Sequence, residues 1–79
     1  MKRQHDKITP DRLIDASIAV LRAVAEVGEE LGGAPLYAPD LMGSAMQPSY
    51  LADFTKYEVE EATAFLERMG MLERIKRRA

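Results

Sequence analysis

The feature that most constrains the fold is a long stretch of helical periodicity between Thr9 and Gly33. Thr9 and Pro10 are suited to the N-cap and first helical position, and Gly32-Gly33 to the left-handed end of the helix. At 100° per residue, the apolar residues cover an arc of about 200° and the main polar ones only about 60°. We therefore expect a helix over residues 10–31 that is either central or shared with a second copy. The dimer contacts we predict on it are Leu13, Val20, Val24 and Val27.

The size of the chain supports the same expectation. Its 79 residues suffice for one domain, and they include no cysteine and a single histidine, His5. A domain of this size buries only about 60% of the surface that its unfolded chain exposes. Without a disulfide or metal to add stability, the core is marginal unless a second copy contributes, so we predict a homodimer. We divide the chain into a flexible basic arm over residues 1–8 and a single domain over residues 9–79.

The middle of the chain gives weaker signals. Residues 34–38 lie between Gly33 and Pro39 and suit either an edge strand or an extended connector. Pro39-Asp40 is expected to open a short helix over residues 41–46, which Gln47-Pro48-Ser49 ends. Residues 50–53 suit a further turn of helix.

The stretch from Thr55 to Gly70 specifies a helix at both ends. Thr55 and Glu58 have the spacing of a capping box, in which each side chain accepts a hydrogen bond from the other residue's backbone N–H. Gly70 suits the C′ position, and Met71 at C″ can then contact Leu66, as in a Schellman motif. Apolar residues repeat at helical spacing between the two caps.

This arrangement resembles the winged helix-turn-helix domains of bacterial transcription regulators. The matching residues are a threonine that begins the recognition helix, a β-branched residue, a leucine, and a glycine with an apolar pair that leads to the wing: Thr55, Val59, Leu66, Gly70 and Met71-Leu72. About twenty residues match closely, and the rest matches only in the order of elements. The resemblance implies a mainly α, small winged-helix-like domain of three or more helices with a minimal or truncated β wing. Residues 71–78 are expected to form a wing strand or an extension of the helix.

The resemblance also implies DNA binding. It places Lys56 and Tyr57 of the recognition helix toward a major groove, and Arg74, Lys76, Arg77 and Arg78 along the DNA backbone. The recognition helix also carries Glu60 and Glu61, whose carboxylates would be repelled by phosphate. We therefore keep two functions open. One is a DNA-binding regulatory or architectural protein that contacts phosphates through its basic tail and N-terminal arm.

The other function is a protein-interaction module, and it follows from how the charges are distributed. The net charge of −2 is the sum of +2 over residues 1–22, −8 over residues 23–67 and +4 over residues 68–79. Such asymmetry is typical of surfaces with different partners. The acidic middle suits a basic protein partner, or imitation of DNA by an inhibitor. A solvated, solubilising surface is the simplest alternative.

The sequence contains no motif that is typical of catalysis or of cofactor binding. His5 is the only histidine, neighbouring carboxylates such as Glu60 and Glu61 diverge by about 100° around a helix, and no glycine-rich phosphate loop occurs. We expect no enzyme activity, cofactor, metal or membrane span, and a cytoplasmic location. Most of the aromatic residues, together with Met42 and Met46, fall between residues 37 and 57. Core packing is their simplest role, with a small-molecule pocket or an exposed partner surface as alternatives.

Overall fold

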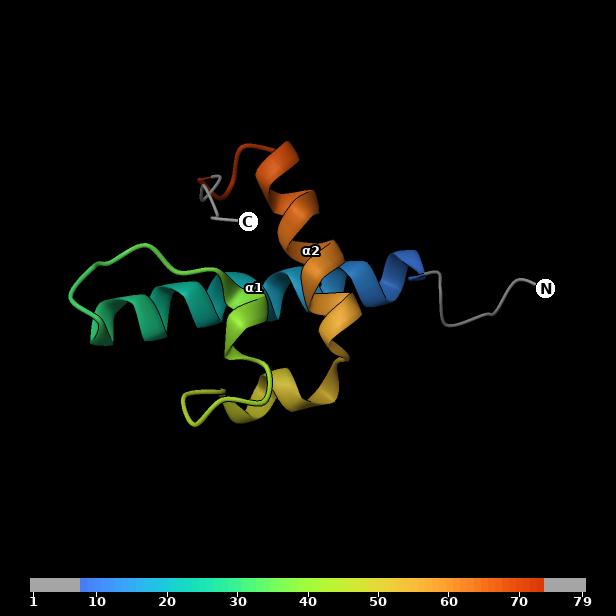
Figure 1. Cartoon of the computed structure of the whole chain (residues 1–79). Coiled ribbons are helices and arrows are strands. Elements are labelled where there is room, and N and C mark those ends of the chain that lie inside the picture. Colours follow the sequence, from blue (N-terminus) through green and yellow to red (C-terminus); the bar gives the residue numbers. More distant parts are fainter. Residues whose placement is uncertain (1–7, 74–79) are drawn as a thin grey trace, which may run out of the picture.

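A computed structural model of the chain describes residues 8–73. Two α-helices dominate this part: α1 over Pro10–Glu30 and α2 over Lys56–Arg68. Between them lie two short 3₁₀ helices, η2 over Ala38–Leu41 and η3 over Ser49–Asp53. In Figure 1, α2 crosses α1 steeply, and η3 lies near α1 on the other side of the crossing from the C-terminal end of α2.

Both α-helices begin at the caps that the sequence predicts. The Thr9 hydroxyl accepts a hydrogen bond from the Arg12 N–H at 3.2 Å, with Pro10 as the first helical residue. At α2, Thr55 Oγ1 accepts from the Glu58 N–H at 3.1 Å, and Glu58 Oε1 accepts from the Thr55 N–H at 3.0 Å. The capping box is therefore confirmed.

The predicted helix ends are confirmed as well. Past α1, the Gly33 N–H donates to the Gly28 carbonyl at 2.8 Å and the Gly32 N–H to the Glu29 carbonyl at 3.1 Å. Past α2, the Met71 N–H donates to the Leu66 carbonyl at 2.9 Å. These are Schellman motifs, and Gly32 and Gly70 have the positive φ angles, 74° and 76°, that favour glycine.

The structure is mainly helical, as predicted, but the rest of the predicted fold class was wrong. Residues 8–73 contain two α-helices, two 3₁₀ helices and no strand, so three or more helices with a β wing are not present there. Residues 34–37 form no strand and residues 71–73 begin no wing; residues 74–78 lie outside the described part. The expected helix over residues 41–46 is replaced by turns, whereas the turn expected over residues 50–53 is present as η3.

Local hydrogen bonds explain why residues 41–46 form no helix. Gly43 has a φ of 80°, which ends any right-handed helix there, and its N–H donates to the Gln47 side chain at 2.6 Å. The Ser44 hydroxyl donates to the Leu41 carbonyl at 2.8 Å. Such side-chain bonds give the backbone an alternative to helical pairing.

The core is small and built largely from alanine and short aliphatic residues. Side chains of α1, η2, η3 and α2 meet there, and the largest that are fully buried are Leu51, Leu66, Val20, Val59 and Pro39. The two α-helices also supply four alanines to this cluster: Ala16, Ala19, Ala23 and Ala62. Small residues of this kind let the backbones of α1 and α2 approach closely, and Val20, Val59 and Leu66 fill the space beside them.

Arg12 connects the beginnings of the two α-helices. Its Nε and Nη2 donate to Glu58 Oε2 and Oε1 at 3.0 and 2.6 Å, and Nη2 also donates to the Asp53 carbonyl at 2.9 Å. Its guanidinium lies 4.7 Å from the centre of the Phe54 ring. The hydrogen bond from Arg12 is the main cause that lowers the pKa of Glu58, against the opposing effect of burial.

We expect Thr55→Ala to lower the free energy of unfolding by about 1 kcal/mol, because it removes the capping acceptor of α2. Ser49→Ala is the control, since Pro48 and not Ser49 occupies the N-cap position of η3. Urea denaturation followed by circular dichroism measures both variants. Equal midpoints for the two variants and the wild type, at unchanged slope, would contradict the role of the cap.

The Arg12–Glu58 pair predicts a pH dependence of stability. Because the folded pKa of Glu58 is lowered, its stabilisation is complete above the ordinary glutamate value of about 4.3 and is lost as pH falls through the folded value. Acid denaturation of Glu58→Gln should therefore be less steep than that of the wild type. Glu60→Gln, on the exposed side of α2, is the matched control and should follow the wild type. An unchanged acid profile for Glu58→Gln would contradict the prediction.

Candidate binding pocket

The pocket lies between the C-terminal halves of α1 and α2. Residues 33–37 close it on one side and Leu72 and Glu73 on another, leaving a volume of about 390 Å³. Pockets that bind small ligands are typically about 300–1,000 Å³, so this one suits a side chain or a small molecule more than a large cofactor. The lining residues are Val24, Ala25, Gly28, Glu29, Gly33, Ala34, Pro35, Leu36, Tyr37, Thr63, Glu67, Leu72 and Glu73.

Gly28 opens the floor of the pocket on the α1 side. It is buried in the last turns of α1, yet a Cβ added there would meet no atom within 4 Å. Glycine in a helix costs about 0.5–1 kcal/mol relative to alanine, so neither space nor helix stability requires it here. The missing side chain leaves room that the pocket occupies.

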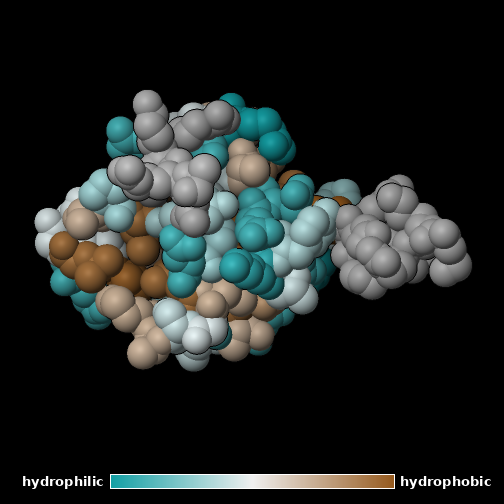
Figure 2. All heavy atoms as spheres, in the orientation of Figure 1, coloured by the Kyte–Doolittle hydropathy of each residue, from teal (hydrophilic) through white to brown (hydrophobic). Residues whose placement is uncertain are grey.

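The walls of the pocket are mostly apolar. Val24, Leu36 and Leu72 are partly buried and pack against the core while still lining the cavity. The Thr63 hydroxyl donates to the Val59 carbonyl at 2.7 Å, so its proton is already used within α2. Figure 2 shows hydrophobic side chains at the surface on the side where the C-terminal half of α1 and the following segment lie. The pocket therefore offers apolar burial to a ligand.

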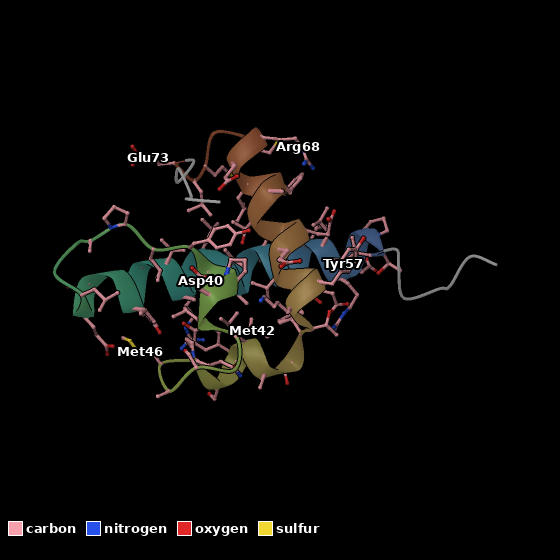
Figure 3. All side chains as sticks on the ribbon, viewed as in Figure 1. Asp40, Met42, Met46, Tyr57, Arg68 and Glu73 are labelled. Atoms are coloured by element: carbon pink, nitrogen blue, oxygen red, sulfur yellow. The ribbon has the colours of Figure 1, made fainter. Side chains whose placement is uncertain are left out.

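The charges on the pocket are all negative. Glu29, Glu67 and Glu73 line it, and its lining includes no lysine, arginine or histidine among the described residues. Arg68 is close in sequence but points elsewhere: Figure 3 shows Arg68 and Glu73 on opposite sides of the C-terminal end of α2. A cationic group on a ligand would therefore meet carboxylates at this site.

Positive charge is sparse on the rest of the described surface, and half of it is paired. Residues 8–73 contain twelve acidic and four basic residues, and Arg12 and Arg22 form ion pairs. Arg22 Nε donates to Glu26 at 3.0 Å, and its guanidinium lies 4.2 Å from the centre of the Tyr50 ring. Tyr50 donates its hydroxyl proton to Glu26 at 2.8 Å. The hydrogen bond from Arg22, followed by that from Tyr50, lowers the pKa of Glu26, whereas burial is the main cause that raises the pKa of Tyr50.

The residues predicted to contact DNA do not form one described surface. Lys56 and Tyr57 are exposed on the first turn of α2, and Figure 3 shows Tyr57 at the end of α2 remote from Arg68 and Glu73. Residues 56 and 68 are about 18 Å apart along the helix axis at 1.5 Å per residue. The tail residues Arg74, Lys76, Arg77 and Arg78 lie outside the described part. Glu60 is exposed on the same helix and Glu61 is half-buried.

The residues predicted for dimerisation pack mainly inside the chain. Val20 and Val27 are 0% and 5% exposed, and Leu13 and Val24 are partly buried against the core. The apolar side chains that α1 exposes most are instead Ile18, at 61%, and Ile14, at 56%. The wide apolar arc was identified from the sequence, but which part of it faces the core was not.

The sequence did not reveal where the pocket lies. A pocket was one alternative for the aromatic group of Tyr37, Tyr50, Phe54 and Tyr57, but of these residues only Tyr37 lines it. The one local signal was Gly28, an unfavourable residue inside an otherwise strong helix. Among residues 8–73, no group of three histidine, cysteine or acidic side chains is placed to hold a metal ion, and no helix is long and apolar enough to cross a membrane.

Comparisons with known proteins return no match to any family model, curated protein or solved structure. The resemblance to winged-helix domains therefore rests on the residues between Thr55 and Leu72 alone.

Proposed function

We propose that this chain is a non-catalytic, cytoplasmic protein-interaction module. Its pocket takes an apolar side chain from a basic segment of a partner protein. The observation that carries the proposal is the combination of apolar walls with three lining carboxylates, Glu29, Glu67 and Glu73, and no cationic lining residue in the described part. Burial of an apolar side chain supplies binding energy at roughly 25 cal/mol per Å², and the carboxylates select a cationic neighbour.

The charge of the remaining described surface supports the same partner. With twelve acidic residues against four basic ones, of which two are ion-paired, residues 8–73 attract a basic segment from a distance. Long-range attraction of this kind acts mainly on the rate of association. Contacts inside the pocket act mainly on the rate of dissociation, so the two contributions can be measured separately.

The test uses a fluorescein-labelled peptide in which one leucine is flanked by arginines, and the same peptide with serine in place of leucine. We expect fluorescence anisotropy to show tighter binding of the leucine peptide. Gly28→Leu should abolish this preference, because the new side chain fills the pocket from α1. Equal binding of the two peptides to the wild-type protein would contradict the proposed pocket.

Two matched pairs of variants separate the pocket from general charge. Glu29→Gln with Glu73→Gln and Glu60→Gln with Glu61→Gln remove the same charge, but only the first pair lines the pocket. We expect the first pair to weaken peptide binding about threefold to tenfold, chiefly through faster dissociation. The second pair should slow association slightly. Equal effects of the two pairs on peptide binding would mean that nonspecific charge attraction alone accounts for the interaction.

DNA binding is the second candidate function. The specific observations that favour it are the adjacent exposed side chains of Lys56 and Tyr57 and the cationic composition of the sequence after Glu73, where four of the next five residues are basic. In this function the basic segments and the first turn of α2 contact the DNA, and the carboxylates of Glu60 and Glu61 on the same helix oppose that contact.

A titration with duplex DNA tests this second candidate. If the tail binds phosphate, neutralising Arg74, Lys76, Arg77 and Arg78 should weaken binding to all sequences and lower the salt slope by about one unit per lost contact. Glu60→Gln with Glu61→Gln should tighten DNA binding, whereas it should leave peptide dissociation unchanged. Absence of binding to any duplex at about 50 mM salt would exclude the DNA-binding function.

A further inference from the structure

The sequence that follows the described part has the chemistry of the ligand proposed for the pocket. Residues 73–78 read Glu-Arg-Ile-Lys-Arg-Arg, so Ile75 is the only apolar residue among them and lies between the cations Arg74 and Lys76. The pocket has apolar walls and three lining carboxylates, which suit an apolar side chain with cationic neighbours. The chain therefore contains its own candidate for the pocket in residues 74–78, the tail.

The position of the tail in the sequence brings it to the pocket. Leu72 and Glu73 line the pocket, and Ile75 follows two residues later, so its Cα lies within about 7 Å of the Cα of Glu73. In an extended backbone, side chains two residues apart point to the same side. An extended continuation would therefore direct Ile75 to the side on which Glu73 lines the pocket.

We propose that Ile75 enters the pocket of its own chain and competes there with the basic segment of the partner. The proposal rests on the proposed function, because both assign the pocket to an apolar side chain between cations. It adds regulation of that site, since a molecule whose tail is docked cannot bind the partner until the tail leaves.

The charges around the pocket favour this docking. Glu29 and Glu73 are exposed lining residues, and no cation among the described lining residues would repel the tail. Arg68, the last basic residue of the described part, lies on the opposite side of the end of α2 from Glu73 (Figure 3). Exposed ion pairs contribute little each, so burial of Ile75 is the main source of a weak, reversible contact.

A weak contact is sufficient because the tail is joined directly to the wall of the pocket. A short tether gives an effective concentration of about 1–10 mM, so a contact with an intrinsic dissociation constant of about 1 mM leaves about a tenth to a half of the pockets open. The same segment of a second copy reaches that concentration only in a protein solution of about 1–10 mM. The tail of the same chain is therefore the favoured occupant.

A tryptophan at position 75 reports docking without any peptide, since the chain has no tryptophan of its own. Acrylamide should quench Ile75→Trp at least about twofold less efficiently than Ala79→Trp, because at least about half of the pockets hold the tail. Gly28→Leu, which fills the pocket from α1, should remove this difference. Three outcomes would overturn the proposal: equal quenching at the two positions, protection that Gly28→Leu leaves unchanged, and protection that grows with protein concentration and so comes from a second copy.

The fluorescein-labelled leucine peptide tests the competition. Ile75→Ser should tighten its binding about twofold to tenfold, because the apparent affinity rises with the fraction of open pockets. Ile18→Ser is the matched control and should leave the affinity unchanged, since Ile18 is 61% exposed on α1 and lies outside the pocket. Where the leucine peptide is preferred to the serine peptide, equal affinities of the wild type and the Ile75→Ser variant would overturn the proposal.

The two measurements distinguish failure of this proposal from failure of the proposed function. If the leucine and serine peptides bind equally even to the Ile75→Ser protein, the peptide-binding function fails, whereas protection of the tryptophan at position 75 still supports docking of the tail. If the leucine peptide is preferred but that tryptophan is unprotected, the pocket binds a partner and the proposal that the tail occupies it is overturned.

Discussion

The rest of the structure depends on the placement of Glu58. Its carboxylate completes the capping box of α2 through the Thr55 N–H and receives two hydrogen bonds from Arg12 of α1. The same guanidinium reaches the Asp53 carbonyl and the Phe54 ring at the end of η3. One carboxylate therefore determines where α2 begins, and one arginine fixes that beginning against α1. These directional contacts add to the small core that both helices share in holding the beginning of α2 against α1.

The pocket lies where α1 and α2 diverge. Alanines bring the helices close where they cross, and beyond the crossing the C-terminal halves of α1 and α2 separate (Figure 1). Leu36 and Leu72 come from the segments that follow the two helices, and each segment leaves its helix through a glycine with positive φ, Gly32 or Gly70. Both segments thus return toward the diverging ends without filling the space between them. The absence of a side chain at Gly28 enlarges the space that remains.

The features of this fold that could be predicted from the sequence are those that depend on short-range interactions. The caps at Thr9, Thr55 and Gly70 depend on residues within one or two turns, so their spacing in the sequence was enough to predict them. The Arg12–Glu58 contact joins residues that are 46 positions apart, and no local pattern signals it. The same limit applies to the apolar arc of α1, because its inward side is decided by where α2 and η3 pack. The resemblance to winged-helix domains was carried by one capped helix, and a capped helix does not determine how many other helices or strands accompany it.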